Sequence, residues 1–306
     1  MEPFIHTAIP KKAVVINDLT GFGRCSLAVV LPVMAAMRVQ ACPVATSVFS
    51  SHMGFPSYYY KDLTDSLTPC FDEYDKLGLT FDGIYCGFLN SPRQFHSIRH
   101  FLEQERQKNA PVILIDPVMG DHGRPYRIVT DQLCEEMRQL VSCATILTPN
   151  LTEACMLTGM VYPQAPPDDS FLEEIAGRLL DLGVSRIAIT GIVCGGHVTN
   201  YCVEKAADMV RSFACKVPSN GESRPGTGDL FAAILTADAV NGVPFADSVK
   251  KAADFIRTCV DTSARLQIPI REGVAYENHL SMLWTPPDAS QTGDKPTPDT
   301  ITERRT

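Results

Sequence analysis

Hydrophobic residues in this chain form short runs that alternate with longer amphipathic stretches. Six short runs are almost continuously apolar, which is the pattern of strands buried on both faces of a parallel sheet. We predict these strands at Ala13–Asn17, Pro43–Val48, Gly83–Gly87, Val112–Ile115, Thr145–Leu147 and Arg186–Thr190. Two further runs, His197–Glu204 and Asp208–Lys216, are separated by a short polar break and predict an antiparallel hairpin at one edge.

The stretches between the strands repeat their apolar positions with a helical period. They predict helices at Ser26–Met37, Pro92–Lys108, Asp131–Val141, Glu153–Thr158, Ser170–Leu182, Asp229–Asn241 and Ala246–Leu266. Ser91 before Pro92 fits an N-cap followed by a first helical position, and Gly183 fits a helix end. We therefore expect an α/β fold, doubly wound, with a mostly parallel central sheet and helices on both faces.

The domain organisation follows from the same pattern. No linker or internal repeat divides the alternating strands and helices, so we expect a single domain over residues 1–284. Residues 285–306 are rich in Pro, Thr, Asp and Ser, and Ile301 is their only large aliphatic residue. We expect this segment to be a disordered tail, because it cannot bury enough apolar surface to fold by itself.

Charge and cysteine usage exclude several classes of protein. The 306 residues include 35 acidic and 27 basic side chains, for a formal net charge of −8, which argues against nucleic acid or an anionic membrane as the partner. No apolar run reaches the roughly 18 residues of a membrane span, and the start lacks the features of a secretory signal. The eleven cysteines are odd in number and contain no Cys-x-x-Cys pair. We expect a cytoplasmic enzyme with reduced thiols and no structural zinc.

Residues that bind ligands should follow strands directly, because ligands of a doubly wound sheet collect beyond the carboxyl ends of its strands. The strongest candidate is Arg224-Pro225-Gly226-Thr227-Gly228-Asp229, where two glycines open a helix. Backbone N–H groups at such a helix start can cradle an anion. Asp229 either caps the helix or accepts a proton from a hydroxyl nucleophile beside the bound anion.

Two further segments carry acidic residues after strands. Asp116 and Asp121 follow the strand Val112–Ile115, where a carboxylate can hold a magnesium ion or simply form a turn. Asn150 and Glu153 follow the next strand at the spacing of a capping box, and their oxygens would also suit magnesium on a nucleotide.

The first strand ends in a segment that resembles a dinucleotide-binding turn but fails its pattern. Gly21 and Gly23 are present, whereas Ser26 stands at the position of the third glycine. The chain also contains no Gly-x-x-x-x-Gly-Lys phosphate loop and no Gly-x-Ser-x-Gly nucleophile elbow. These absences disfavour dinucleotide enzymes, P-loop enzymes and α/β-hydrolases.

Three of these segments together carry a resemblance to a known family. Asp116-Pro117-Val118-Met119-Gly120-Asp121, Thr148-Pro149-Asn150-Leu151-Thr152-Glu153 and Gly226–Ala233 have the order and spacing seen in the ribokinase superfamily. Within it the chain is similar to pyridoxal (vitamin B6) kinases, which also match Phe49-Ser50-Ser51-His52 and Gly87-Phe88 in type. The similarity covers all but the two ends of the chain.

The resemblance implies an activity and roles for the site residues. Asp229 would be the catalytic base that deprotonates the 5′-hydroxymethyl group of a B6 vitamer. Gly226, Thr227 and Gly228 would form the anion hole for the transferring phosphoryl group. ATP with Mg²⁺ would be bound by Asp116, Thr148, Asn150, Glu153 and Thr190, with Asp116 and Glu153 nearest the metal. The resemblance also implies a K⁺ ion beside the anion hole and a homodimer, and it places Asp121 and Tyr126 in a segment that covers the site.

The substrate side departs from the family's pattern. Asn17-Asp18 stands where the family usually carries a serine, Met53 follows His52 where a threonine is usual, and Phe88 replaces a tyrosine. We expect Asp18, His52, Met53 and Phe88 to contact the substrate, and Asp18 could pair with a protonated amine or ring nitrogen. Asp18 could equally be a turn residue, and His52 a structural histidine.

These departures leave two alternatives open. The first is a kinase of the same superfamily with another alcohol, foremost a hydroxymethylpyrimidine kinase, whose substrate is also a flat ring with a hydroxymethyl arm. The second is a protein of the same fold that binds a B6 compound without turnover.

Overall fold

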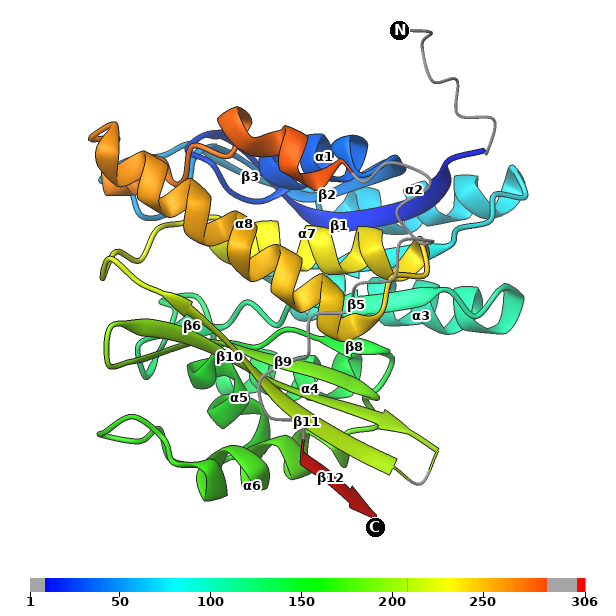
Figure 1. The fold of residues 1–306 in the computed structure, drawn as a ribbon. Helices are drawn as coiled ribbons and strands as arrows, with labels where there is room; N and C mark the ends of the chain where they lie inside the picture. Colours follow the sequence, from blue (N-terminus) through cyan, green and yellow to red (C-terminus); the bar gives the residue numbers. More distant parts are fainter. Residues whose placement is uncertain (1–8, 208, 285–301, 306) are drawn as a thin grey trace, which may run out of the picture.

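The structure of the protein is a computed structural model that describes residues 9–207, 209–284 and 302–305. A ten-stranded sheet runs through these residues in the order β12-β11-β10-β9-β8-β5-β4-β1-β2-β3 (Figure 1). Its central pairs, from β2 through β1, β4, β5 and β8 to β9, are all parallel. The fold is therefore the mostly parallel, doubly wound sheet that the sequence predicts.

The strands and helices have the following bounds. The central strands are β1 (Lys11–Phe22), β2 (Val39–Ser51), β4 (Gly83–Cys86), β5 (Val112–Ile115), β8 (Ile146–Leu147) and β9 (Arg186–Cys194). The antiparallel strands at the edges are β3 (Tyr60–Asp62), β10 (His197–Ala206), β11 (Met209–Pro218) and β12 (Thr302–Arg305). The helices are α1 (Leu27–Ala36), α2 (Thr64–Lys76), α3 (Pro92–Lys108), α4 (Asp131–Val141), α5 (Leu151–Thr158), α6 (Asp169–Leu180), α7 (Thr227–Val240) and α8 (Phe245–Arg265). A small separate hairpin joins β6 (Gly120–Asp121) to β7 (Arg124–Pro125), and two 3₁₀ turns lie at Ile270–Glu272 and Glu277–Leu283.

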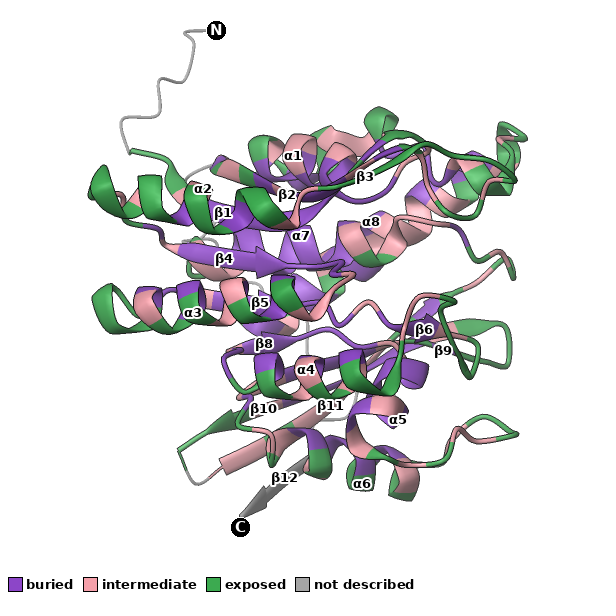
Figure 2. Ribbon diagram, turned by 180° about the vertical axis from the view of Figure 1, so that it is seen from behind, coloured by how far each residue is buried: buried purple, intermediate pink, exposed green. Residues whose placement is uncertain are grey.

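Two hydrophobic layers enclose the sheet. Helices α1, α7 and α8 pack on one face, in front of the sheet in Figure 1. Helices α2 to α6 cover the other face, where Figure 2 shows the central strands buried beneath them. Successive residues of β1 contribute to the two layers: Ala13 and Val15 pack with α1, α7 and α8, and Val14 and Ile16 pack on the face covered by α2 to α6. This double burial explains why the central strands are continuously apolar.

Several predicted features are confirmed. The hairpin of β10 and β11 is antiparallel, and Ser91 caps α3 by accepting a hydrogen bond from the Gln94 amide with Pro92 as first helical residue. All eleven cysteines are free thiols. In the described part of the chain, no helix is both long and apolar enough to cross a membrane.

The structure differs from the prediction at several elements. The sequence did not reveal α2, because only Leu67 and Phe71 of its residues are buried and Pro69 lies inside it. The short edge strand β3 was also missed, and β1 continues past Asn17 to Phe22. Residues 285–301 and 306 of the predicted tail lie outside the described residues, while residues 302–305 pair with β11 as β12.

Candidate active site

Asp229 lies in the first turn of α7 and receives hydrogen bonds from two neighbouring strands and a loop. Its Oδ1 atom accepts from Asn17 Nδ2 of β1 at 2.9 Å and from the Tyr85 hydroxyl of β4 at 3.3 Å. Its Oδ2 atom accepts from the backbone N–H of Ser26 at 2.8 Å. All three partners are neutral, so the carboxylate is oriented without being held in an ion pair.

The environment of Asp229 suits a general base. The side chain is half-buried, and burial raises the pKa of this carboxyl to about 6, with the Asp18 carboxylate adding to the rise. A base is most effective when its pKa lies near the working pH. Because Oδ1 accepts two hydrogen bonds and Oδ2 only one, Oδ2 keeps a lone pair for a proton.

The glycines before Asp229 shape the helix start in different ways. Gly226 is the N-cap residue, with φ 84°, and a Cβ added there would lie 1.9 Å from the carbonyl oxygen of Arg24. Only glycine fits that position. At Gly228 the nearest atom to an added Cβ is an oxygen of Asp116, at 3.6 Å, so the space beside this amide faces a carboxylate of the predicted nucleotide site. The Thr227 hydroxyl donates back to the Arg224 carbonyl at 3.2 Å and closes the turn.

A buried arginine, Arg224, stabilises this turn. The Arg224 guanidinium is paired with Glu222 at 2.7 Å and donates to the carbonyls of Ile268 at 3.0 Å and Gly273 at 3.1 Å. Arg224 is 4% exposed, and its charge is satisfied entirely by these contacts with the chain. It therefore fixes the loop before α7 against the segment that follows α8.

Asp116 follows β5 and faces the start of α7. Its Oδ1 accepts from the Thr148 hydroxyl at 3.2 Å. Burial, and next the neighbouring Asp229 carboxylate, raises the pKa of Asp116 to about 8. The structure thus brings together Asp116, Thr148 and Asp229, which the sequence placed in three separate motifs.

Asn150 and Glu153 form the capping box that their spacing predicts. Asn150 Oδ1 accepts from the Glu153 amide at 3.0 Å, and Glu153 Oε2 accepts from the Asn150 amide at 2.8 Å. Glu153 Oε1 also accepts from the Met119 amide at 3.2 Å, which ties the loop after β5 to α5. Thr190 joins the same cluster, because its amide donates to the Pro149 carbonyl at 2.8 Å.

The buried carboxylates fit a divalent cation. Burial, and next the charge of Asp116, raises the pKa of Glu153 well above its ordinary value. Two neighbouring buried acids with raised pKa values, whose partners are a hydroxyl and backbone amides, are costly to keep ionised unless a cation shares the site. Among the described residues, no group of three or more His, Cys, Asp or Glu side chains forms a metal site on its own. A magnesium ion here would therefore complete its shell with oxygens from water and a ligand.

A short hairpin covers the edge of this cluster. β6 and β7 are joined by His122 and Gly123, both with positive φ, which is the conformation of a tight hairpin turn. The Gly123 amide donates to the Thr152 hydroxyl at 2.8 Å, so the hairpin is attached to α5. Asp121 lies in this hairpin and Tyr126 directly after it, where burial and the charge of Glu153 raise the pKa of Tyr126.

Phe88, a predicted substrate contact, follows β4 and packs against another aromatic ring. Its ring meets Phe49 edge-on at 6.2 Å between centroids, and Phe49 also packs against Tyr60 at 4.8 Å. The Phe88 amide donates to Asn17 Oδ1 at 3.0 Å. Asn17 therefore connects Phe88 directly to Asp229.

His52 and Met53 lie in the loop after β2. Both ring nitrogens of His52 contact the chain: Nδ1 accepts from the Gly54 amide at 3.1 Å, and Nε2 lies 2.7 Å from the Arg271 carbonyl. The His52 ring packs on Phe55 at 4.7 Å, and Met53 is 38% exposed. The predicted substrate contacts of these two residues stay predictions.

Asp18 is 5% exposed, and both of its oxygens accept hydrogen bonds within the chain. Oδ1 accepts from the Ser26 hydroxyl at 2.6 Å and Oδ2 from the Thr20 hydroxyl at 2.7 Å. Burial raises the pKa of this carboxyl. The predicted pairing with a substrate amine or ring nitrogen stays untested, and these contacts favour an internal role.

Sequence reasoning missed the groups that orient Asp229. Tyr85 was predicted as an ordinary member of a buried strand and Ser26 as the first residue of a helix, while Asn17 was noted only as a departure from the family's pattern. The position of Asn17 near the carboxyl end of a strand was a further signal. Contacts that span 212 residues, as between Asn17 and Asp229, become visible only in the fold.

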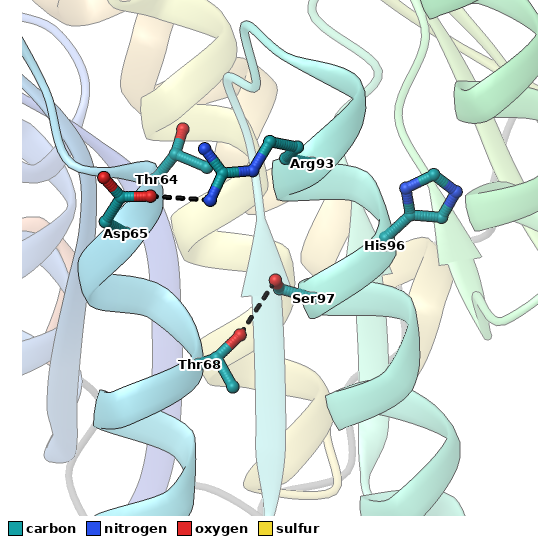
Figure 3. Close-up of a pocket in the computed structure, with 6 residues that line it drawn as sticks. All are labelled: Thr64, Asp65, Thr68, Arg93, His96 and Ser97. Atoms are coloured by element: carbon teal, nitrogen blue, oxygen red, sulfur yellow. Dashed lines mark hydrogen bonds and ion pairs between the residues drawn. The ribbon is translucent and has the colours of Figure 1, made fainter.

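A separate groove of about 320 Å³ lies between the first turns of α2 and α3 (Figure 3). Its polar groups contact each other: Arg93 pairs with Asp65 at 2.6 Å, and the Thr68 and Ser97 hydroxyls lie 3.0 Å apart. None of the predicted site residues lines this groove.

Comparison with known proteins agrees with this geometry. The sequence profile of a family described as phosphomethylpyrimidine kinase matches residues 31–272. A hydroxymethylpyrimidine/phosphomethylpyrimidine kinase of Haemophilus influenzae is 30% identical over 180 residues, which cover 57% of this chain and 63% of that enzyme. A pyridoxal kinase of Arabidopsis thaliana is 27% identical over 250 residues, covering 79% of this chain and 77% of the relative.

Solved structures show the same fold. A protein of Bacteroides thetaiotaomicron, provisionally described as a phosphomethylpyrimidine kinase and crystallised with pyridoxal, superposes with a TM-score of 0.85 at 31% identity. The superposition covers 96% of this chain and 100% of that one. The expected relation to this group of kinases is thus confirmed, and the chain belongs to the phosphomethylpyrimidine kinase family.

Proposed function

We propose that this protein uses ATP to phosphorylate the 5′-hydroxymethyl group of a vitamin B6 vitamer (pyridoxal, pyridoxamine or pyridoxine), and that it serves the salvage of pyridoxal 5′-phosphate. One observation carries the proposal: the Asp229 carboxylate is oriented by three neutral donors beside the glycine-framed start of α7. A protein that only binds a B6 compound would need no base at that position.

The base acts through one oxygen. Oδ1 is engaged by Asn17 and Tyr85, so Oδ2 accepts the proton of the attacking hydroxyl. The alcohol oxygen forms a bond to the γ-phosphorus of ATP while the bond to the β-phosphate oxygen breaks, and ADP leaves. The pKa of about 6 keeps Asp229 ionised at neutral pH and able to take that proton.

The start of α7 serves the phosphoryl group. The amides of Gly226, Thr227 and Gly228 lie at the positive end of the helix dipole. With no side chain at Gly228, the space before these amides stays open to an anion. Preorganised donors of this kind stabilise charge that develops on phosphoryl oxygens.

The nucleotide would lie beyond β5, β8 and β9. Asp116 and Glu153 would hold Mg²⁺, which when bound neutralises charge on the β- and γ-phosphates. Thr148, Asn150 and Thr190 line the same edge of the sheet and would fix the position of the phosphates.

The aromatic residues on the proposed substrate side support a flat aromatic alcohol. The Phe49 and Phe88 rings contact each other and the Phe88 amide donates to Asn17, while His52 and Phe55 form a second aromatic pair in the loop after β2. Aromatic side chains suit stacking and edge contacts with a planar ring. The structure crystallised with pyridoxal, at 31% identity, is consistent with this substrate class.

A hydroxymethylpyrimidine kinase is the second candidate, and the family profile and the 30% identical relative favour it. Steady-state kcat/KM with pyridoxal, pyridoxamine, pyridoxine and hydroxymethylpyrimidine, each with ATP and Mg²⁺, separates the two. We expect a B6 vitamer to give the highest kcat/KM. A higher value for hydroxymethylpyrimidine would support the second candidate, and ADP release with none of these alcohols would contradict both.

Two further properties complete the proposal. We expect a homodimer, which light scattering on the purified protein checks. We also expect K⁺ to support activity better than Na⁺ at equal ionic strength, and equal rates in the two salts would contradict a potassium site.

A further inference from the structure

Ser26 has a backbone conformation that serine rarely adopts. Its φ is 58° and its ψ is −146°, a region populated almost only by glycine, and the residue is 7% exposed. Holding a side-chain-bearing residue there is energetically unfavourable, and such residues cluster at functional sites. The rest of the structure must therefore hold Ser26 in place.

The Ser26 side chain also does not cap its helix, as serine usually does at a helix start. Ser26 is the N-cap residue of α1, yet its side chain makes no capping hydrogen bond. At the start of α3, by contrast, Ser91 has φ −147° and caps through its side chain. The Ser26 hydroxyl instead donates to Asp18 Oδ1 at 2.6 Å.

Asp18 lies where the pairing of β1 with β2 is irregular. The register shifts between Asn17 and Leu19, where two residues of β2, Thr46 and Ser47, stand opposite Asp18 and form a bulge. Bulges redirect side chains and are common beside active sites. Here the Asp18 carboxylate is buried and points to the Ser26 hydroxyl.

The backbone of the strained residue Ser26 contacts Asp229, the proposed base. The Ser26 amide donates to Asp229 Oδ2 at 2.8 Å, and Oδ2 is the oxygen that keeps a free lone pair. We propose that Asp18 and Ser26 are positioning residues: Asp18 anchors the Ser26 hydroxyl and thereby holds the Ser26 amide against Oδ2 of Asp229. The inference rests on the proposed function, because it assigns these residues to the base of that reaction.

The two oxygens of Asp229 are thus fixed from consecutive residues of β1. Asn17 donates a hydrogen bond to Oδ1 directly, whereas Asp18 positions the donor to Oδ2 through Ser26. Because both oxygens are fixed, the remaining lone pair of Oδ2 points in a single direction. Asp18 then affects the rate of transfer without touching the alcohol.

The test compares two substitutions of Ser26 with a matched substitution of Ser91. In Ser26→Ala the anchor is lost and the strained backbone relaxes, which moves the amide away from Oδ2. In Ser26→Gly the anchor is also lost, but glycine tolerates the conformation and keeps the amide nearer its place. Ser91→Ala removes a true cap and serves as the control for a purely structural effect.

We expect Ser26→Ala to lower kcat by about 10–100-fold and Ser26→Gly by less than about tenfold, with KM for ATP and alcohol within about twofold of wild type. Ser91→Ala should lower Tm and leave kcat unchanged. Wild-type kcat in Ser26→Ala, or an equal loss of kcat in the two Ser26 variants, would overturn the proposal.

Asp18→Asn separates positioning from direct substrate binding. An asparagine has one acceptor oxygen and one donor NH2 group, so one of the two hydroxyls on Asp18 loses its acceptor. We expect a lower kcat, an unchanged KM for the alcohol, and a double variant with Ser26→Ala no slower than Ser26→Ala alone. A raised KM for pyridoxamine with normal kcat, or multiplied losses in the double variant, would overturn the proposal.

These measurements use the alcohol that wild type turns over fastest. If that alcohol is hydroxymethylpyrimidine, the vitamer assignment fails while the comparison of variants still judges the role of Asp18 and Ser26. If a vitamer is fastest and Ser26→Ala behaves as wild type, the function stands and the positioning role fails.

Discussion

The proposed nucleotide side and the proposed alcohol side of the site are built differently. Beyond β5 and β8, Asp116 and Glu153 are buried carboxylates whose partners are one hydroxyl and backbone amides. Beyond β1 and β2, both oxygens of Asp18 and both ring nitrogens of His52 already have partners in the chain. Among the described residues, no basic side chain pairs with the two acids of the first side, whereas the polar groups of the second side are satisfied within the chain.

Because of this difference, the type of reaction is inferred from one side of the site and the alcohol substrate from the other. Groups that lack a partner of opposite charge identify what they bind, and here they indicate a metal-bound phosphate. Groups that are satisfied internally leave the nearby aromatic side chains as the main indication of the alcohol. Relatives named for two different alcohols match this chain at 30% and 27% identity.

The largest effect is expected from removing Asp229, the proposed base, which lies between the two sides. Asp229→Asn should lower kcat by about 10²–10⁴-fold, the usual contribution of a general base. Nucleotide affinity should be kept, because the amide is isosteric. Steady-state turnover and calorimetric binding of ADP measure both, and near-wild-type turnover would remove Asp229 from its role.

The two glycines before Asp229 should respond in opposite ways. Gly226→Ala forces a Cβ to 1.9 Å from the Arg24 carbonyl at φ 84°, so we expect destabilisation by about 2 kcal/mol or more and a lower Tm. Gly228→Ala meets no atom closer than 3.6 Å, so Tm should hold while kcat falls. Unchanged rates in a stable Gly228→Ala protein would contradict the anion hole.

The nucleotide side should depend on magnesium through its buried acids. Asp116→Asn should raise the Mg²⁺ concentration needed for half-maximal rate by about 10–100-fold. Asp82→Asn is the control, since Asp82 precedes β4 at the opposite edge of the sheet, where it contacts Lys11 and Lys12. An equal response of the two variants to magnesium would argue against a metal role for Asp116.

The smallest effects are expected on the alcohol side. Phe88→Tyr and Met53→Thr introduce the residues that pyridoxal kinases usually carry. Each should change the ratio of kcat/KM between pyridoxal and hydroxymethylpyrimidine by about 2–10-fold while kcat stays within that range, since one contact in a binding pocket contributes about that much. A ratio that stays constant in both variants would place these residues outside the alcohol site.

The sequence predicts the fold well because the central strands carry their own signal. Val14, Val15 and Ile16 are buried on both faces of the sheet, and only a buried parallel strand requires such a run. Helix α2 was missed for the opposite reason, since it buries little and contains Pro69. Local pattern therefore reveals elements in proportion to how much apolar surface they bury.

The site was predictable only in part. Asp229, Gly226 and the Asn150–Glu153 capping box lie within short segments whose spacing indicates their chemistry. The support from Asn17, Tyr85 and Ser26 joins segments that are 144 to 212 residues from Asp229 along the chain. No local pattern shows such contacts, and the strain at Ser26 is a property of the folded backbone alone.

The pH dependence of kcat/KM tests the central claim most directly. Because the pKa of Asp229 is raised to about 6 and the base must be ionised, kcat/KM should fall tenfold per pH unit below about pH 6. The Asp229→Asn variant should not show this decrease of kcat/KM at acidic pH. It is measured with the same alcohol, so that titration of the substrate affects both proteins equally. An acid limb that survives unchanged in Asp229→Asn would contradict the assignment of Asp229 as the base.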